Sequence, residues 1–126
     1  MVKRSPSLKY VRLAAQAASD KIGQDILALD VRGLTAVTDI FLFVGATSHV
    51  HVRALEDAVR EKLRDGGANL LRTDGRRGQL WRVLDYGSLI VHIMEQKTRE
   101  FYAVERLWNE AKKVNVARQK EIVSRE

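Results

Sequence analysis

The sequence predicts an α/β domain in which a mixed β-sheet is flanked by helices. Three observations lead to this prediction. Stretches with apolar residues at helical spacing alternate along the chain with shorter apolar stretches typical of strands. The chain has 126 residues, of which 45% are hydrophobic, and this fits a globular protein with one ordinary core. No internal repeat or linker divides it, so we expect a single domain.

The first half of the chain predicts the order helix, strand, strand, helix. Residues 8–22 carry an apolar stripe at helical spacing. The stretch 25–31 alternates apolar residues, and the run 40–44 has the apolar, aromatic-rich composition of a buried strand. Ser48 is a favourable N-cap for a second helix, 49–64, whose apolar residues share one face.

The second half predicts three strands and a last helix. Residues 69–72 form a short strand and lead into a polar loop, 73–78. Strands 80–85 and 89–94 then form a hairpin around a tight turn that contains a glycine. The complete order is helix, two strands, helix, three strands, helix, which predicts one α/β layer structure with a mixed sheet.

The last predicted helix begins at Thr98, which can serve as its N-cap. Phe101 and Trp108 are seven residues apart on one face of this helix, so we expect both in the core. After Lys112 the apolar periodicity fades into polar and charged residues. We therefore divide the chain into a domain, 1–112, and a basic C-terminal tail, 113–126.

The charge balance limits the classes of partner. Lys and Arg number 22 against 16 Asp and Glu, a net charge of +6. This balance is compatible with binding of nucleic acid or a ribonucleoprotein, although a solvated surface explains most charges in most proteins. Arg72, Arg76 and Arg77 are the candidates for RNA contact. No apolar run approaches the roughly 20 residues of a membrane span, so we expect a cytoplasmic protein that contacts no membrane.

The motifs of enzyme and cofactor sites are missing from the sequence. Cysteine is absent, which excludes disulfides and thiol chemistry. The sequence contains neither of the two glycine-rich phosphate-loop motifs, and it contains no nucleophile elbow. It also contains no D-x-D or D-x-E pair of carboxylates. His49 and His51 are two residues apart on a predicted helix and point in different directions, so they do not chelate one metal easily, with or without His92. We therefore expect no enzyme, no cofactor and no metal.

Seven short stretches carry a family resemblance, and they occur in the expected order between about Ser7 and Asn109. They are Asp25–Val31, Thr38–Phe41, Gly45–Ser48, Trp81–Gly87, Val91–His92, Arg99–Tyr102 and Glu105–Trp108. Each stretch is weak alone, whereas the ordered set is specific. Through this set the chain resembles the ribosomal silencing factor family, also called Iojap-like.

The resemblance implies a fold, a partner and an action. It implies a nucleotidyltransferase-like α/β fold that is used without catalysis. Family members bind the fourteenth protein of the large ribosomal subunit, at the face that meets the small subunit. Their occupancy prevents subunit joining and represses translation, chiefly when nutrients are short. Family members also form homodimers when they are off the ribosome.

Two regions depart from the family pattern, one at Ser88 and one at the start of the second helix. Ser88 stands where the family often has an aspartate, so an attractive charge toward a basic partner is lost and Asp85 must supply more of it. His49 and His51 replace a more polar start of the second helix. The basic tail lies outside the resemblance, and its role stays unassigned.

The predicted strand 80–85 places the contact surface. Trp81 and Asp85 point to one face, and they cannot both be deeply buried unless Asp85 has a partner. In one reading, Trp81 packs under the last helix and Asp85 caps the following turn. In the other, which the resemblance favours, Trp81, Asp85 and Tyr86 form an exposed patch for a basic partner. With Arg99 and Tyr102 from the matching stretches, these residues are our predicted ribosomal-protein-binding site.

Two other functions stay open at this point. One is a ribosome-assembly factor that contacts ribosomal RNA through the arginine loop and the basic tail. Its binding would weaken steeply with salt, because phosphate neutralisation releases counterions. The other is a nucleotidyltransferase-like enzyme with a degenerate site, which nucleotides would stabilise against heat.

Overall fold

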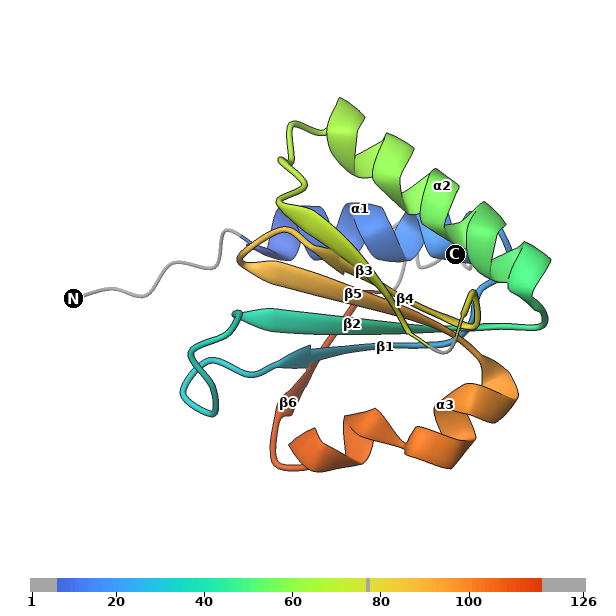
Figure 1. Ribbon diagram of the computed structural model, residues 1–126. Helices are drawn as coiled ribbons and strands as arrows, with labels where there is room; N and C mark the ends of the chain where they lie inside the picture. The colour runs from blue at the N-terminus through green and yellow to red at the C-terminus, as the bar shows by residue number, and fades with distance from the viewer. Residues whose placement is uncertain (1–6, 77, 117–126) are drawn as a thin grey trace, which may run out of the picture.

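A computed structural model describes residues 7–76 and 78–116, and over these residues the chain forms one mixed six-stranded sheet with helices on both faces (Figure 1). This confirms the predicted fold class. The elements in chain order are α1 (Ser7–Asp20), β1 (Gln24–Asp30), β2 (Ile40–Ala46), α2 (His49–Asp65), β3 (Arg72–Arg76), β4 (Trp81–Asp85), β5 (Leu89–Glu95), α3 (Gln96–Tyr102), the 3-10 helix η1 (Val104–Trp108) and β6 (Lys112–Val114).

The sheet has the order β3-β4-β5-β2-β1-β6. Its two central strands, β2 and β5, pair in parallel, and every other neighbouring pair in this order is antiparallel. All seven residues of β2 are buried, which explains why its sequence is continuously apolar rather than alternating. The hairpin of β4 and β5 forms as the sequence predicts, around a turn in which Gly87 adopts a positive φ of 88°.

Helices α1 and α2 cover one face of the sheet, and α3 with η1 covers part of the other (Figure 1). The first face holds the larger core cluster, which includes Leu42, Leu55, Leu63 and Leu84. Helix α2 begins as predicted, because the Ser48 hydroxyl accepts a hydrogen bond from the His51 backbone N–H at 3.1 Å. The second face holds a smaller cluster that is rich in aromatic rings.

The strand predicted at residues 69–72 is wrong in its placement. Strand β3 instead spans Arg72–Arg76, so it shares only Arg72 with the predicted strand and otherwise occupies the predicted polar loop. It is an edge strand paired only with β4 within the sheet, and Thr73 lies opposite Leu84 in this pairing. An edge strand with little buried surface does not need an apolar sequence, so its composition resembles that of a loop.

The last predicted helix is also wrong in its extent. Glu95, rather than Thr98, is the N-cap of α3, and its carboxylate accepts the Thr98 backbone N–H at 3.0 Å. The helix ends at Tyr102 because Ala103 adopts a left-handed conformation with φ 47°. Phe101, within α3, is 79% exposed and outside the core, whereas Trp108, beyond the break, packs against Phe41 with ring centroids 5.3 Å apart.

Strand β6, which extends the sheet beyond β1, is not among the predicted elements. This strand starts at Lys112, and Val114 and Val116 pack against the core beside α1 and α2. Positions 113–116 of the predicted tail thus belong to the fold, while 117–126 lie outside the described residues. Within the described ranges, no helix has the length and apolar character needed to cross a membrane.

Candidate protein-binding surface

A row of aromatic rings crosses the face of the sheet that α3 and η1 cover in part. Phe101 meets Tyr102 edge to face at 4.9 Å, and Tyr102 lies 5.4 Å from Trp81. Trp81 contacts His92, which contacts Phe41, which in turn contacts Trp108. At the α3 end of this row the rings are exposed, Phe101 by 79% and Tyr102 by 39%.

A groove of about 500 Å³ lies beside this row, between η1 and the strands β3 and β4. Its floor includes Phe41, Val83 and His92, and Leu107 and Val37 form exposed apolar walls. Charged and polar side chains from β3 and β4 line the opposite wall, among them Arg72, Asp74 and Asp85. We call Val37, Trp81, Phe101, Tyr102, Leu107 and Trp108 the aromatic surface.

The predicted sidedness of β4 is confirmed. Trp81 and Val83 pack on the aromatic side, and Leu84 packs in the core under α1 and α2. Trp81 is only partly buried, and its indole N–H donates a hydrogen bond to His92 Nδ1 at 3.1 Å. It therefore contributes both to the core cluster beneath and to the surface above.

Asp85 is engaged by its own neighbourhood. Its Oδ1 atom accepts the Gly87 backbone N–H at 2.8 Å, and its Oδ2 atom accepts Arg72 Nε at 3.1 Å. Its side chain is 17% exposed and lines the groove. The carboxylate thus stabilises the hairpin turn, as in the alternative in which Asp85 caps the turn after its strand. Its charge is balanced by Arg72 at the groove.

Tyr86 does not join Trp81 in one patch. It packs against the core under α1 and α2, on the opposite face of the sheet. Burial raises the pKa of its phenol, and Arg60 and Glu56 of α2 are the charged groups that act on it. The prediction that Tyr86 lies beside Trp81 is wrong, because Tyr86 follows Leu84 by two residues and alternation puts it on the face of Leu84.

Arg99 is also wrongly placed on the surface. It is 5% exposed, its Nε atom donates to Glu105 Oε2 at 3.0 Å, and its Nη1 atom donates to the Gln24 carbonyl at 3.3 Å. These bonds hold α3, η1 and the start of β1 together. Arg99 thus positions the elements that carry Tyr102.

The candidate RNA-contact residues are only partly described. The Arg72 side chain is 78% exposed while it pairs with Asp85. Arg76 ends β3, and Arg77 lies outside the described residues.

A charge cluster around the buried Glu56 lies on the other face of the sheet. The Glu56 carboxylate accepts hydrogen bonds from Arg82 through both oxygens, at 2.9 and 3.0 Å, and from Arg60 at 3.2 Å. Burial raises the pKa of Glu56, but these bonds outweigh it and lower that pKa overall.

His51 serves the fold, whereas His49 is exposed in the first turn of α2. His51 Nδ1 accepts the Thr47 backbone N–H at 2.9 Å, and its Nε2 atom lies 2.8 Å from the Lys21 carbonyl. His51 thereby connects the end of α1 to the start of α2. In the part of the chain that the structure describes, no group of three or more His, Asp or Glu residues is placed to hold a metal ion.

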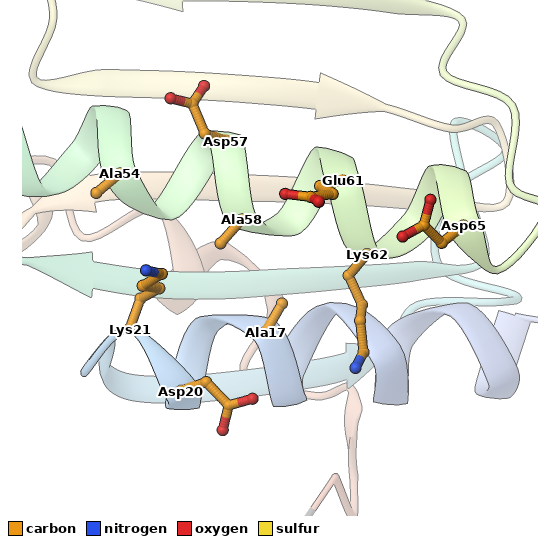
Figure 2. Close-up of a pocket in the computed structure, with 9 residues that line it drawn as sticks. All are labelled: Ala17, Asp20, Lys21, Ala54, Asp57, Ala58, Glu61, Lys62 and Asp65. Carbon is orange, nitrogen blue, oxygen red and sulfur yellow. The ribbon is translucent and has the colours of Figure 1, made fainter.

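A second groove lies between α1 and α2, and it differs in character from the aromatic groove. Figure 2 shows Ala17, Ala54 and Ala58 where the two helices face each other, with Lys62 reaching from α2 toward α1. Acidic residues of both helices line it, including Asp57 and Glu61. It exposes small and charged side chains rather than large apolar ones.

Sequence reasoning missed Val37 and Leu107 as members of the aromatic surface. Val37 lies in the loop between β1 and β2 and is 66% exposed, and Leu107 is 76% exposed on η1. A large apolar residue in a predicted loop was the available signal for Val37. Leu107 carried no such signal, because a continuous helix would have placed it among core positions.

The geometry defines a small α/β domain with an exposed aromatic face. The family model described as "Ribosomal silencing factor during starvation" matches residues 4–126, and the chain belongs to this family. The matched residues extend beyond both ends of the span 7–109 that carries the resembling stretches, and they include the C-terminal segment.

Individual relatives agree with this assignment. The ribosomal silencing factor of Bacillus subtilis is 32% identical over 101 residues, which are 80% of this chain and 86% of that protein. A mouse protein named "Mitochondrial assembly of ribosomal large subunit protein 1" is 28% identical over 68% of this chain and 39% of its own length. A crystal structure of a Chromobacterium violaceum protein matches with a TM-score of 0.77 and 31% identity, covering 80% of this chain and 84% of that one.

Proposed function

We propose that the protein binds the large ribosomal subunit through its aromatic surface and thereby blocks joining of the small subunit. The contact we propose is with the fourteenth protein of the large subunit, at the face that meets the small subunit. The exposed aromatic surface is the observation that supports this proposal, in a chain that belongs to the ribosomal silencing factor family.

The composition of the surface supports a protein partner. Phe101, Leu107 and Val37 are exposed by 79, 76 and 66%, which is unfavourable in water unless a partner covers them. Tryptophan and tyrosine are the residue types that most often dominate the binding energy of an interface. Trp81 and Tyr102 lie together in the row of rings, and a charged wall of the groove gives the rim a polar character.

Silencing of this kind needs occupancy and no chemistry. A protein that binds one of two joining surfaces excludes the other partner by its volume alone. We therefore propose no catalytic step and no cofactor, and the domain acts as a steric block whose potency is set by its affinity and concentration.

A joining assay with purified ribosomal subunits tests this function. Light scattering follows the association of the two subunits as the protein is added. Wild-type protein is expected to inhibit joining in proportion to its binding to free large subunits, and Trp81→Ala to inhibit much less. Val50→Ser, a change at a 66% exposed residue on α2, is the matched control and should inhibit like wild type. Unchanged joining at saturating wild-type protein would refute the proposal.

A second candidate is a role in assembly of the large subunit, because the mouse relative is named for that process. Contact with ribosomal RNA through Arg72 and its neighbours would then dominate. Affinity for the large subunit would fall steeply with salt, with a slope that grows with the number of phosphates contacted. Contact with a ribosomal protein through apolar rings predicts a shallow slope instead.

We also propose that the free protein is a homodimer, because a second copy can cover the exposed rings in the absence of the ribosome. Light scattering of the free protein as a function of concentration is the measurement. A monomer mass at every concentration would contradict this part of the proposal and leave the joining assay unaffected.

A further inference from the structure

We propose that His92 is a positioning residue for the aromatic surface. Its Nδ1 atom holds the indole of Trp81, and the affinity of the surface for its partner depends on that hydrogen bond. The inference rests on the proposed function, since it concerns the same surface, and it adds a residue that acts beneath the surface rather than on it.

His92 lies at the junction of the two parts of the surface. Its ring stacks on Phe43, with centroids 5.1 Å apart and an interplanar angle of 15°, and it also contacts Phe41 at 5.4 Å. On its other side lies Trp81, at 6.1 Å. The exposed rings of α3 lie next to Trp81, and the groove beside η1 begins at Phe41. His92 contacts both Trp81 and Phe41, and it therefore connects the rings of α3 to the groove.

The polarity of the hydrogen bond follows from the two side chains. An indole nitrogen is a donor only, so His92 Nδ1 is the acceptor in the 3.1 Å bond from Trp81 Nε1. A neutral imidazole that accepts at Nδ1 carries its hydrogen at Nε2. His92 is 9% exposed and packed between aromatic rings, and a polar group so placed specifies the orientation of what it binds.

The bond matters for binding because it orders Trp81 before a partner arrives. Trp81 is only partly buried, so packing alone restrains its ring less than it would in a closed core. Its indole in turn supports Tyr102, whose ring lies 5.4 Å away. A surface whose anchors are already ordered loses less entropy on binding and therefore binds more tightly.

Two substitutions of His92 separate positioning from packing. In His92→Asn the amide oxygen, like Nδ1, is bonded to the atom after Cβ, so it can accept the indole hydrogen, but the apolar area of the ring is lost. In His92→Leu the apolar volume is retained, and the acceptor is lost. Burial predicts that His92→Leu is the more stable of the two variants, whereas positioning predicts that His92→Asn binds large subunits more tightly.

We expect His92→Leu to weaken binding to purified large subunits about tenfold and His92→Asn to weaken it less than about threefold. Phe43→Leu is the control, since it removes the stacked ring without touching the hydrogen bond; it should lower stability and leave the affinity of the folded protein unchanged. Thermal melts of all variants accompany the titrations. Equal affinities of His92→Leu and wild type would overturn the inference, as would an affinity order that simply follows stability.

A readout without the ribosome keeps this inference distinct from the proposed function. In nuclear magnetic resonance spectra, the Trp81 indole N–H is assigned by comparison with Trp108→Phe. Its exchange with solvent should be slow in wild type and His92→Asn, and about tenfold faster in His92→Leu. Fast exchange in wild type overturns the inference directly. Slow exchange in a wild-type protein that fails to bind large subunits overturns the proposed function and, with it, the role of His92 in binding.

Discussion

The two faces of the sheet differ in how completely helices cover them. On one face, α1 and α2 have 14 and 17 residues, and Leu55 and Leu63 of α2 are fully buried against the sheet, as are Leu42 and Leu84 of the strands beneath. On the other face, α3 and η1 have seven and five residues, and rings of the aromatic surface reach solvent. The first face holds the apolar area that stabilises the fold, and the second retains apolar area for a partner.

The shortness of α3 creates this difference. Ala103 adopts a left-handed conformation, which is unfavourable for a residue with a Cβ, and the chain turns there from α3 into η1. Arg99 of α3 bonds to Glu105 of η1 across this break and to the Gln24 carbonyl of β1. The face above β3 and β4 is therefore left open as the groove, because no long helix crosses it.

The largest expected effect lies on the closed face. Leu63→Ala removes a fully buried side chain on the inner face of α2 and should lower the free energy of unfolding by about 3–5 kcal/mol, since it loses transfer free energy and leaves a cavity. Denaturant unfolding measures the loss. The folded fraction should bind large subunits like wild type. A loss below about 1 kcal/mol would mean that the two faces do not divide stability and binding in this way.

Two aromatic residues on opposite faces give the next contrast. Trp81→Ala should weaken binding to large subunits by about 2 kcal/mol or more, as expected for an aromatic anchor of an interface. Tyr86→Ala, five residues away and packed against the helix-covered core, should lower stability and leave the affinity of the folded protein unchanged. Titrations and thermal melts of both variants decide the matter. A similar loss of affinity in both variants would place the binding surface elsewhere.

The buried ion pairs of the closed face predict a pH effect. Arg82 and Arg60 hold the pKa of Glu56 below its ordinary value although burial raises it. A lowered carboxyl pKa adds stability that is complete above the unfolded pKa of roughly 4.3 and is lost as the pH falls through the folded pKa. Glu56→Gln should therefore lower stability by about 1 kcal/mol at pH 7, a modest value because both arginines keep some exposure.

Acid unfolding checks this sign. The difference in unfolding free energy between wild type and Glu56→Gln should shrink as the pH falls below about 4, because protonated Glu56 loses its charge as the amide has. Other carboxyls titrate in both proteins and cancel in the difference. A difference that grows on acidification would show that Glu56 is not held in its charged form by the two arginines.

Local signals made part of this structure predictable. The Ser48 cap and the apolar run of β2 are encoded within a few residues, and both formed as expected. Strand β3 was misplaced because its pairing with β4, rather than its own polar sequence, defines it. The break at Ala103 has no local stop signal, and it accompanies a buried pair between Arg99 and Glu105 that only the folded chain reveals.

The candidate site, like the fold, was predictable from the sequence only in part. Alternation along β4 correctly gave the face of Trp81, because strand geometry fixes it. The same alternation puts Tyr86 on the face of Leu84, opposite Trp81, so the error lay in grouping Tyr86 with Trp81 through the family resemblance. The prediction that one continuous helix buries both Phe101 and Trp108 is wrong for Phe101, which is exposed on α3, a helix that ends one residue later.

The smallest expected effect concerns two exposed apolar residues, one on each side of the molecule. Leu107 is 76% exposed at the aromatic groove, and Val50 is 66% exposed on α2. Substitution of either by serine should change the free energy of unfolding by no more than about 0.5 kcal/mol, because little buried area is lost. Leu107→Ser should nevertheless weaken binding to large subunits about threefold to tenfold, since a partner would bury that side chain. Val50→Ser should leave the affinity unchanged. Titration of large subunits with each variant provides the comparison. Equal affinities of the two variants would show that the partner does not cover the groove wall at η1. The contact would then be restricted to the rings around Trp81.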